Sequence, residues 1–428
     1  MDFTAATADQ VLAIRVNAGI DELATHERFS AATPDMVEAI VEGIGQFAAG
    51  EWAPLNRIGD KEGAVLANGT VSLPDGFAAA YQAYVEQGWN AIAGPVEHGG
   101  QGLPFALAAN VLENLGSANM AFSLLPMLTV GAIESLHHHG SPAQQALYLP
   151  RLISGEWSGT MNLTEPQAGS DVGALRTTAT PRGDGTWSIK GTKIFITWGE
   201  HDLSGNVIHL VLARTPGAPA GTRGISLFLV PKYHVNADGS LGARNDLRCA
   251  GLEHKLGIMA SPTCVMSFGD NDACIGELVG HENEGIKAMF TMMNSARINV
   301  GSQGVQIAER AFQQARAYAR DRIQATRAGS PDKTPVPITD FNSEQIRAAI
   351  SGKTFQYTRA DGNGFITYNA DGSFSYQDDV KGGGIGKWTA NGTEYCETFG
   401  KNPPECGVFK NTGDAYFAAQ SRLVEMKV

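Results

Sequence analysis

The sequence predicts a multidomain α+β protein in which helical and β segments follow one another along the chain. A 3.6-residue apolar period runs through the first third, short β-branched runs fill the middle, and a second set of short strands follows a Pro-rich segment. At 428 residues the chain is long enough for two to four domains. The expected parts are a helical N-terminal domain (1–157), a β-barrel-like middle domain (158–284), one long helix of a helical bundle (285–326), a linker (327–340) and a small β-meander (341–428).

The helical part is indicated by Ala-rich amphipathic stretches separated by loops with Gly and Pro, such as the loop 94–102. Three consecutive histidines, His137–His139, are interpreted as a helix end before Gly140. They are not expected to bind a metal together, because adjacent helical side chains point in different directions. The main helical stretches are Asp35–Phe47, Phe77–Gln87 and Pro104–Leu115.

The middle part changes to Val, Ile, Thr and Phe runs between Gly-containing turns, which is typical of β-strands. A long amphipathic helix, Gly285–Arg322, follows it. The predicted strands of the middle part are Trp187–Ile189, Ile194–Thr197, Ile208–Ala213, Gly224–Pro231 and Thr263–Phe268.

The composition breaks after the long helix. Arg327–Ile338 is a Pro-rich linker, and Asp-Gly, Gly-Gly-Gly and Asn-Gly turns then separate short strands. This pattern predicts a meander that closes a small barrel or a sandwich. Its predicted strands are Lys353–Thr358, Gly364–Asn369, Ser373–Gln377, Gly386–Thr389 and Glu394–Phe399.

Charge and hydropathy narrow the function classes. With 32 Lys and Arg against 44 Asp and Glu, the net charge of −12 disfavours nucleic acid and anionic membranes as partners. We expect no membrane span, since no run approaches eighteen apolar residues, and a cytoplasmic location, since the first residues do not resemble a secretory signal.

The five cysteines are few for this length. Cys249, Cys264 and Cys274 lack metal-ligand spacing and are expected to be buried thiols. Cys396 and Cys406 are close enough in sequence to be bridged. We expect them to be reduced in a cytoplasmic protein and joined in an exported one.

Two spaced motifs carry the functional signal. The segment Met161–Asp171 reads MNLTEPQAGSD, and Gly191–Thr197 reads GTKIFIT. In the first, an apolar run ends at Thr164, and a Pro-containing turn holds Gly169 and Ser170; the second ends in another hydroxyl. Backbone donors and hydroxyls would converge on a flat polar ligand. The alternative is an ordinary strand, turn and strand.

These motifs resemble the flavin-binding core of acyl-CoA dehydrogenases, particularly the large bacterial type. Two further segments support the resemblance, Glu253–Thr263 and the Met293–Arg297 opening of the long helix. The similarity runs from about Met36 to Gln324. It implies an FAD-dependent oxidoreductase of fatty acid metabolism that acts on acyl-CoA thioesters and forms a homo-oligomer, and it leaves the electron acceptor and the acyl chain length open.

The resemblance also implies roles for individual residues. Around FAD, the backbone of Leu163 and Thr164 would contact the pyrimidine edge of the flavin, with Gly169 in the same turn; Ser170 would bond the phosphate region and Thr197 would bond near N5. Phe195 stands where many relatives place Trp against the ring, although an aromatic residue there could equally fill a core. Arg322 would reach FAD phosphates in a neighbouring subunit. For the substrate, the implied residues near the CoA arm are Ser261, Asn294 and Arg297.

The chemistry also needs a carboxylate, which removes the α-proton while hydride leaves the β-carbon. In most of the family this base lies on later helices, for which the sequence after the long helix has no counterpart. A minority of relatives place it directly before the helix Arg, and that position is Ala296 here. Glu309 is thirteen residues further on and about 20 Å along the axis, so it cannot substitute.

Three interpretations stay open from the sequence. The chain is an acyl-CoA dehydrogenase-like enzyme, or a non-catalytic protein that binds FAD, acyl-CoA or a partner, or the junction near Ile338 joins two unrelated coding segments. Two other motifs are set aside: Asp361–Gly372 lacks the ligands of a calcium loop, and Gly382–Trp388 lacks the spacing of a phosphate loop.

Overall fold

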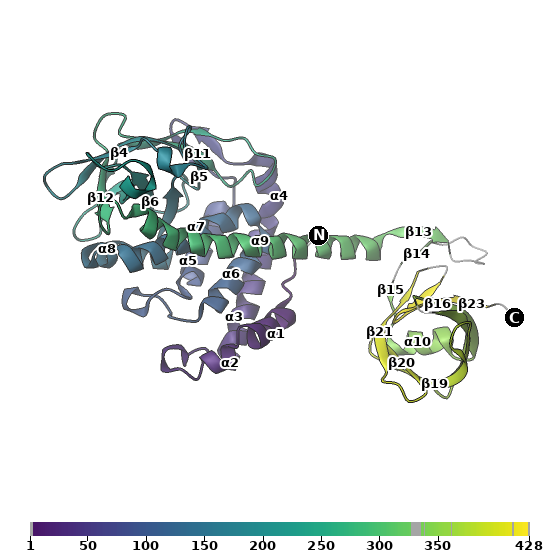
Figure 1. The fold of residues 1–428 in the computed structure, drawn as a ribbon. Coiled ribbons are helices and arrows are strands. Elements are labelled where there is room, and N and C mark those ends of the chain that lie inside the picture. Colours follow the sequence, from purple (N-terminus) through teal and green to yellow (C-terminus); the bar gives the residue numbers. More distant parts are fainter. Residues whose placement is uncertain (1–2, 327–334, 338, 361, 413–414, 427–428) are drawn as a thin grey trace. The chain divides into compact units, whose positions relative to one another are not determined.

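The computed structural model describes residues 3–326, 335–337, 339–360, 362–412 and 415–426, and the chain divides into two compact units (Figure 1). The larger unit comprises residues 2–311, and the barrel unit comprises 312–428. The long helix α9 (Gly285–Asp321) begins in the larger unit, and its last turns are counted with the barrel unit.

The N-terminal part of the larger unit is helical, as predicted. Its helices begin at the expected signals: Thr33 caps α3 by accepting from the Met36 N–H at 3.3 Å, and Ser141 forms a capping box with Gln144 at the start of α8. The regular helices are α1 (Thr7–Asn17), α2 (Ile20–Leu23), α3 (Pro34–Phe47), α4 (Ala53–Glu62), α5 (Phe77–Glu86), α6 (Phe105–Ala118), α7 (Met120–His139) and α8 (Pro142–Ser154). The short helical segments of the larger unit are η1 (Glu27–Phe29), η2 (Ala48–Trp52), η3 (Trp89–Ala91), η4 (Val96–His98), η5 (Val172–Ala174) and η6 (Gly221–Gly224).

A β-hairpin within this helical part was missed by the sequence analysis. Strands β1 (Val65–Ala67) and β2 (Thr70–Ser72) pair antiparallel around Asn68 and Gly69, which both have positive φ, 52° and 77°. An Asn-Gly pair is the residue combination that a two-residue hairpin turn favours. The signal was therefore present in the sequence.

The middle of the larger unit is an eight-stranded sheet with the order β10-β11-β5-β12-β7-β6-β3, and β4 pairs with β5. Strands β3 and β6 are parallel and the other pairs are antiparallel. Two further strands, β8 (Tyr233–Val235) and β9 (Leu241–Arg244), form a separate pair. The sheet strands are β3 (Trp157–Asn162), β4 (Thr178–Pro181), β5 (Trp187–Thr197), β6 (Asn206–Ala213), β7 (Ser226–Pro231), β10 (Leu247–Leu252), β11 (Thr263–Phe268) and β12 (Ile275–Val279).

Helix α7 is long and apolar enough to span a membrane by length and composition, but 78% of its apolar window is buried inside the structure. It packs against β3, where a Cβ added to Gly159 would lie 2.4 Å from the Ala132 Cβ atom. Trp198, which follows β5, links the sheet to α7, because its indole N–H donates to the Ala121 carbonyl at 3.2 Å. Helix α7 is thus a core helix of the larger unit, and it ends at Gly140 as predicted.

The barrel unit closes the predicted meander into a ring. Eight strands pair antiparallel in sequence order from β16 to β23, and β16 also pairs with β23, while the short β15 adds to β21. The strands are β15 (Thr339–Asp340), β16 (Lys353–Arg359), β17 (Gly362–Tyr368), β18 (Ser373–Asp378), β19 (Gly382–Asn391), β20 (Glu394–Phe399), β21 (Glu405–Asn411), β22 (Tyr416–Ala418) and β23 (Ser421–Glu425). The predicted linker (327–340) lies largely outside the described residues. Within it, β14 (Pro335–Pro337) pairs with β13 (Ile323–Thr326), which occupies residues predicted as the end of the long helix.

Two features of the barrel unit differ from the sequence analysis. A helix that was not predicted, α10 (Ser343–Ile350), packs Ile346 and Ile350 into the aromatic core of the barrel, as its place within the ring in Figure 1 illustrates. Cys396 and Cys406 form a disulfide, with their Cα atoms 4.0 Å apart, whereas reduced thiols were expected. They face each other on β20 and β21, so the pairing of the strands brings them together. The three cysteines of the larger unit are buried and free, as predicted.

Candidate cofactor and substrate site

The two sequence motifs meet at one end of the middle sheet. The Thr160 hydroxyl on β3 donates to the Thr197 carbonyl at the end of β5, at 3.0 Å. Two residues beyond the end of β3, the Thr164 carbonyl accepts a hydrogen bond from the Ile194 N–H at 2.9 Å. The loop that leaves β3 therefore lies directly against the last residues of β5.

A buried ion pair fixes this loop. The Lys193 ammonium lies 2.8 Å from Glu165 Oε1 and also donates to the Leu163 carbonyl at 3.0 Å. Glu165 accepts further hydrogen bonds from the Thr177 hydroxyl at 2.6 Å and from the Arg176 N–H at 2.7 Å. The Lys193 side chain is 0% exposed and that of Glu165 is 3% exposed. The loop is thereby held at the Leu163 carbonyl and at the Glu165 carboxylate.

Burial alone would raise the pKa of Glu165. The charge of Lys193 and the hydrogen bonds from Lys193, Thr177 and Arg176 outweigh it and lower that pKa to about 2. Burial lowers the pKa of Lys193 to about 8, against the attraction of Glu165. At neutral pH the carboxylate is ionised and the ammonium carries its proton, so the pair is a salt bridge.

Phe195 presents its ring at the surface. Its φ is +59° and the residue is 57% exposed, although it stands in an eleven-residue strand of otherwise mostly buried or half-buried positions. A left-handed conformation costs a bulky residue about 1–3 kcal/mol and is concentrated at functional sites. An exposed aromatic ring held in such a conformation is suited to contact a flat ligand.

The hydroxyls predicted to bind the cofactor lie on β5 and on the loop after β3. Thr164 and Thr197 are half-buried and Ser170 is exposed. Gly169 brings the loop back to Thr164, because a Cβ added to it would lie 3.4 Å from Thr164 Cγ2. Within the described part of the chain, the side-chain hydroxyls of Thr164, Ser170 and Thr197 have no protein hydrogen-bond partner. They are available to a ligand.

The segment between β10 and β11 borders a cleft of about 390 Å³. Ser261 at its end is fully buried, and its hydroxyl has no hydrogen-bond partner in the described residues. Its carbonyl accepts from Lys255 Nζ at 2.9 Å. Leu256 is fully exposed, and Ile258 is 37% exposed with a φ of +50°. The cleft is lined by Asp60–Ala64, Leu252–Lys255, Met259, Pro262 and Thr263.

Helix α9 places its predicted substrate residues at the surface. Arg297 is exposed, donates to Asn294 Oδ1 at 2.9 Å and lies 5.3 Å from the centre of the Phe290 ring. Ala296 beside it is half-buried and carries no ionisable group. Met292, on the preceding turn, is buried in the hydrophobic cluster against which Leu163 packs. The beginning of α9 and the loop after β3 therefore share one core.

Arg322 belongs to the barrel unit. Its guanidinium donates to the Tyr318 hydroxyl and lies 5.6 Å from the centre of that ring. Its expected role, binding the FAD phosphates of a neighbouring subunit, stays a prediction.

The sequence analysis missed the residues that shape the site. Glu165 and Lys193 lie inside the two motifs, but no role was assigned to them. A Lys between Thr192 and Ile194 in a strand that ends in apolar residues was the available signal, because a buried Lys requires an anionic partner. A second buried group lies just beyond β5, where Glu200 contacts both Lys232 and Arg244.

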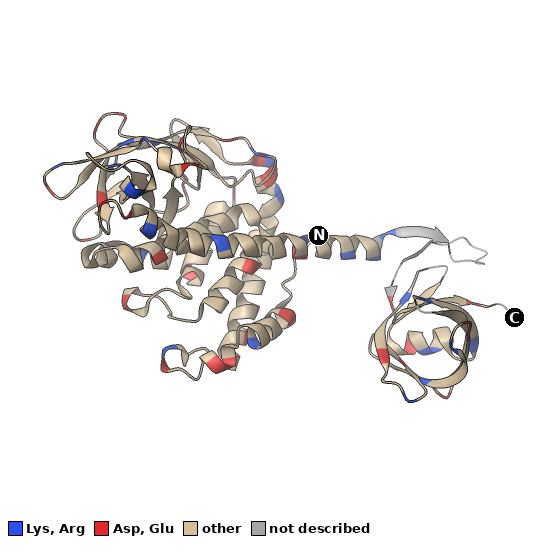
Figure 2. Cartoon of the chain, viewed as in Figure 1, with Lys and Arg blue, Asp and Glu red and all other residues tan. Residues whose placement is uncertain are grey.

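The geometry at the ends of β3 and β5 is compatible with the predicted site for a flat polar cofactor. It offers an exposed aromatic ring, free hydroxyls and a loop fixed from below by a buried ion pair. Figure 2 shows the Lys and Arg positions interspersed with Asp and Glu positions along the ribbon. An anionic ligand would therefore rely on local cationic groups.

Comparison with known proteins supports this interpretation. Residues 34–156 match the family model of the acyl-CoA dehydrogenase N-terminal domain, and residues 160–271 match that of the middle domain. The chain belongs to the acyl-CoA dehydrogenase family, whose members depend on FAD.

Two curated relatives give the scale of the similarity. The chain is 52% identical over 338 residues to 3-methylmercaptopropionyl-CoA dehydrogenase of Ruegeria pomeroyi, covering 79% of this chain and 57% of that protein. It is 40% identical to a butyryl-CoA dehydrogenase of Syntrophomonas wolfei, covering 72% and 50%. The chain thus spans about half the length of the curated relatives it matches.

Solved structures agree in fold. The butyryl-CoA dehydrogenase structure from Megasphaera elsdenii matches with a TM-score of 0.56 at 24% identity, covering 69% of this chain and 71% of that one. An acyl-CoA dehydrogenase from Bacillus anthracis, solved in complex with FAD, matches with a TM-score of 0.56 at 25% identity, covering 68% and 45%. The predicted helical N-terminal domain and β middle domain are confirmed.

Proposed function

We propose that the larger unit binds FAD at the junction of β3 and β5 and that the chain is an acyl-CoA dehydrogenase-like oxidoreductase, of the type that introduces an α,β double bond into acyl-CoA thioesters. The observation that carries the proposal is the loop after β3, which the Glu165–Lys193 pair fixes beside the exposed ring of Phe195. Family membership supplies the cofactor and the reaction class.

Each site residue has a part in this proposal. The backbone of Leu163 and Thr164 contacts the pyrimidine edge of the flavin, Gly169 lets the loop pass close to Thr164, and Ser170 and Thr197 donate hydrogen bonds to the cofactor. Phe195 lies against the ring. Bound FAD supplies the hydride acceptor of the reaction.

The substrate part of the site is proposed on α9 and on the segment before β11. Arg297 and Asn294 are exposed and bonded to each other, so the guanidinium is already oriented for a phosphate or carbonyl oxygen of the CoA arm. The unpartnered hydroxyl of buried Ser261 is a further donor or acceptor for that arm. Arg322 of a second copy is the proposed partner for FAD phosphates, which makes the active form a homo-oligomer.

Catalysis by this chain is proposed to be slow, because Ala296 provides no base. A general base contributes about 10²–10⁴-fold to such a proton transfer. The same observation favours a second candidate function, a non-catalytic protein that holds FAD or acyl-CoA without turnover.

Cofactor binding is tested by titrating purified full chain into FAD and following flavin fluorescence. We expect quenching or a spectral shift at micromolar protein. Thr197→Val should weaken binding about 5- to 10-fold, because one charge-assisted or neutral hydrogen bond contributes about 1 kcal/mol net.

Thr192→Val is the matched control, because Thr192 is an exposed residue of the same strand outside the proposed site. Equal weakening by both variants would assign the effect to the strand and not to the hydroxyl. No change in flavin fluorescence with the unmodified protein would contradict the proposal as a whole.

A further inference from the structure

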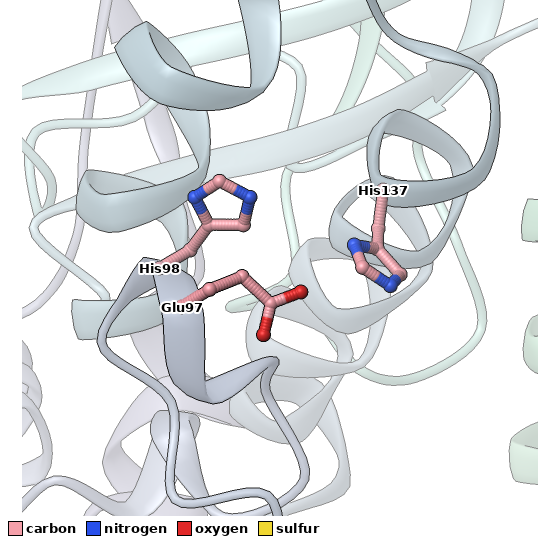
Figure 3. A group of neighbouring side chains, drawn as sticks. All are labelled: Glu97, His98 and His137. Carbon is pink, nitrogen blue, oxygen red and sulfur yellow. The ribbon is translucent and has the colours of Figure 1, made fainter. Parts of the chain in front are cut away.

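A second cluster of ligand-type side chains lies outside the cofactor site. Glu97 and His98 on η4 and His137 on the last turn of α7 each present one ligand atom, and these atoms all lie within 4.8 Å of one another. Figure 3 shows the Glu97 carboxylate lying between the two imidazole rings. The cluster joins residues that are forty positions apart in the sequence.

The backbone on both sides is firmly held. On the η4 side, the Gly100 N–H donates to the Pro95 carbonyl at 2.9 Å. A Cβ added to Gly100 would lie 2.0 Å from the Gly94 carbonyl oxygen, so the loop is too tight at this position for any other residue. On the α7 side, Gln145 Nε2 donates to the His137 carbonyl at 2.9 Å. The backbone from which the three side chains extend is therefore anchored on both sides.

The three side chains lack polar partners elsewhere in the part of the chain that the structure describes. Within the described residues, none of them makes a side-chain hydrogen bond or an ion pair to the protein, and the Nδ1 atom of His137 is buried without a partner. An unpaired buried imidazole nitrogen is unfavourable unless a ligand satisfies it. Its neighbours differ: His138 lies 3.5 Å from Glu134, and His139 bonds the Thr291 hydroxyl at 2.7 Å.

We propose that Glu97, His98 and His137 bind a divalent transition-metal ion of the zinc class. Two imidazoles and one carboxylate are ligands that Zn²⁺ and Co²⁺ accept, and three protein ligands leave a fourth position for water. In a tetrahedral shell, ligand atoms about 2.1 Å from the metal lie roughly 3.4 Å apart. Rotation of the exposed Glu97 side chain and small movements of the two rings, of about 1 Å, bring the set to that spacing.

The proposal differs from the sequence analysis, which expected no metal ligand. That expectation considered the three adjacent histidines as one set, and they do diverge. His137 finds its partners on a different element instead. The bound ion would tie the loop 94–102 to the end of α7, two segments that the sequence separates by a whole helix.

The experiment uses the full chain freed of metal by dialysis against a chelator. Zn²⁺ binding is measured by calorimetry, and Co²⁺ is added as a spectroscopic probe. We expect one high-affinity equivalent per chain and visible absorption bands of low-symmetry Co²⁺. Glu97→Gln and His137→Gln should each weaken Zn²⁺ binding at least 10-fold.

His138→Gln is the matched control, because it removes a neighbouring histidine that faces Glu134 and leaves the cluster intact. It should leave the affinity unchanged. Equal loss with His138→Gln and His137→Gln, or the absence of stoichiometric binding by the unmodified chain, would overturn the proposal. Melting curves in chelator show whether each variant is folded. If His137→Gln does not fold, Glu97→Gln decides the test, because Glu97 is exposed and its substitution should leave the fold intact.

Discussion

At the scale of single residues, the proposed cofactor site rests on the buried Glu165–Lys193 ion pair. Glu165 in the loop after β3 pairs with Lys193 on β5, and Lys193 also holds the Leu163 carbonyl. A buried pair of this kind contributes little net stability, but removing one partner leaves an uncompensated buried charge. The pair therefore acts by fixing the position of the loop.

We predict that Glu165→Gln destabilises the larger unit by about 3–5 kcal/mol at neutral pH, because Lys193 is left buried without its anion. Glu165→Gln/Lys193→Met should recover much of that loss, since both buried charges are then gone. The double variant should still bind FAD more weakly than the unmodified chain, because nothing holds the Leu163 carbonyl. Chemical denaturation and FAD titration measure the two effects separately.

The acid dependence follows from the direction of the pKa shift. The pKa of Glu165 is lowered to about 2 in the folded chain, so its contribution to stability is present above the ordinary value near 4.5. It is lost as the pH falls from about 4.5 to 2, and it corresponds to about 3 kcal/mol. The double variant should lack this part of the acid limb. An unchanged acid limb would mean that Glu165 is not ionised in the folded state.

Single residues also show how far sequence reasoning reaches. Thr164, Gly169, Ser170 and Thr197 were placed in one site from two motifs, and the structure brings those motifs together at the ends of β3 and β5. Lys193 and His137 could not be assigned in the same way. The fold brings Lys193 to Glu165, 28 residues away, and His137 to Glu97, 40 residues away. Contacts at such separations leave no periodic pattern in the sequence.

At the scale of elements, the environment of α9 changes along its length. Its first turns are buried against the core of the larger unit, whereas several later apolar residues are exposed. In the larger unit these are Ile298, Val300, Val305 and Ile307, with exposed fractions between 50% and 60%. An amphipathic helix predicts such an apolar face from sequence, but not what covers it.

The base position on α9 gives a direct test of the proposed chemistry. Ala296→Glu should raise the rate at which acyl-CoA bleaches bound FAD by about 10²-fold or more, because it places a carboxylate one residue before Arg297. The measurement is anaerobic stopped-flow absorption of the flavin. Ala308→Glu, an exposed position on the same helix, should have no effect.

Rapid bleaching by the unmodified chain would show that another residue serves as the base. Failure of Ala296→Glu in a protein that binds FAD would instead favour the non-catalytic interpretation. The two outcomes are distinguishable because cofactor binding is measured in the same sample.

At the scale of the whole molecule, the two compact units have separate cores. The change in composition near residue 330 predicted a division of the chain, but the boundary lies between Ala311 and Phe312, inside α9. The Asp-Gly and Asn-Gly turns predicted most of the barrel strands. The pattern left open whether the meander closes into a barrel or packs as a sandwich, and it did not predict the helix α10. Both depend on contacts between the two ends of the segment, which short-range sequence signals do not report.

We predict two thermal unfolding transitions, of which a reductant shifts only the one that belongs to the barrel unit. The Cys396–Cys406 disulfide closes a loop of ten residues, and the loss of such a crosslink costs about 3 kcal/mol in the chain-entropy estimate. For a domain of this size that lowers the melting temperature by roughly 10 °C. Calorimetry with and without reductant provides the measurement.

Cys396→Ser/Cys406→Ser should reproduce the reduced behaviour and respond no further to reductant. Cys249, Cys264 and Cys274 are buried thiols of the larger unit, so its transition should stay in place. A reductant-induced shift of both transitions would mean that the two units do not unfold independently.

The pairing of β16 with β23 sets an order of events during synthesis. The ring joins residues 353–359 to residues 421–425, so β16 has no partner on that side until residues 421–425 have left the ribosome. Until then its edge is open, and an open edge is a template for pairing with other chains. A stop codon before Ser421 would therefore leave a permanent open edge at β16, which β23 covers in the structure.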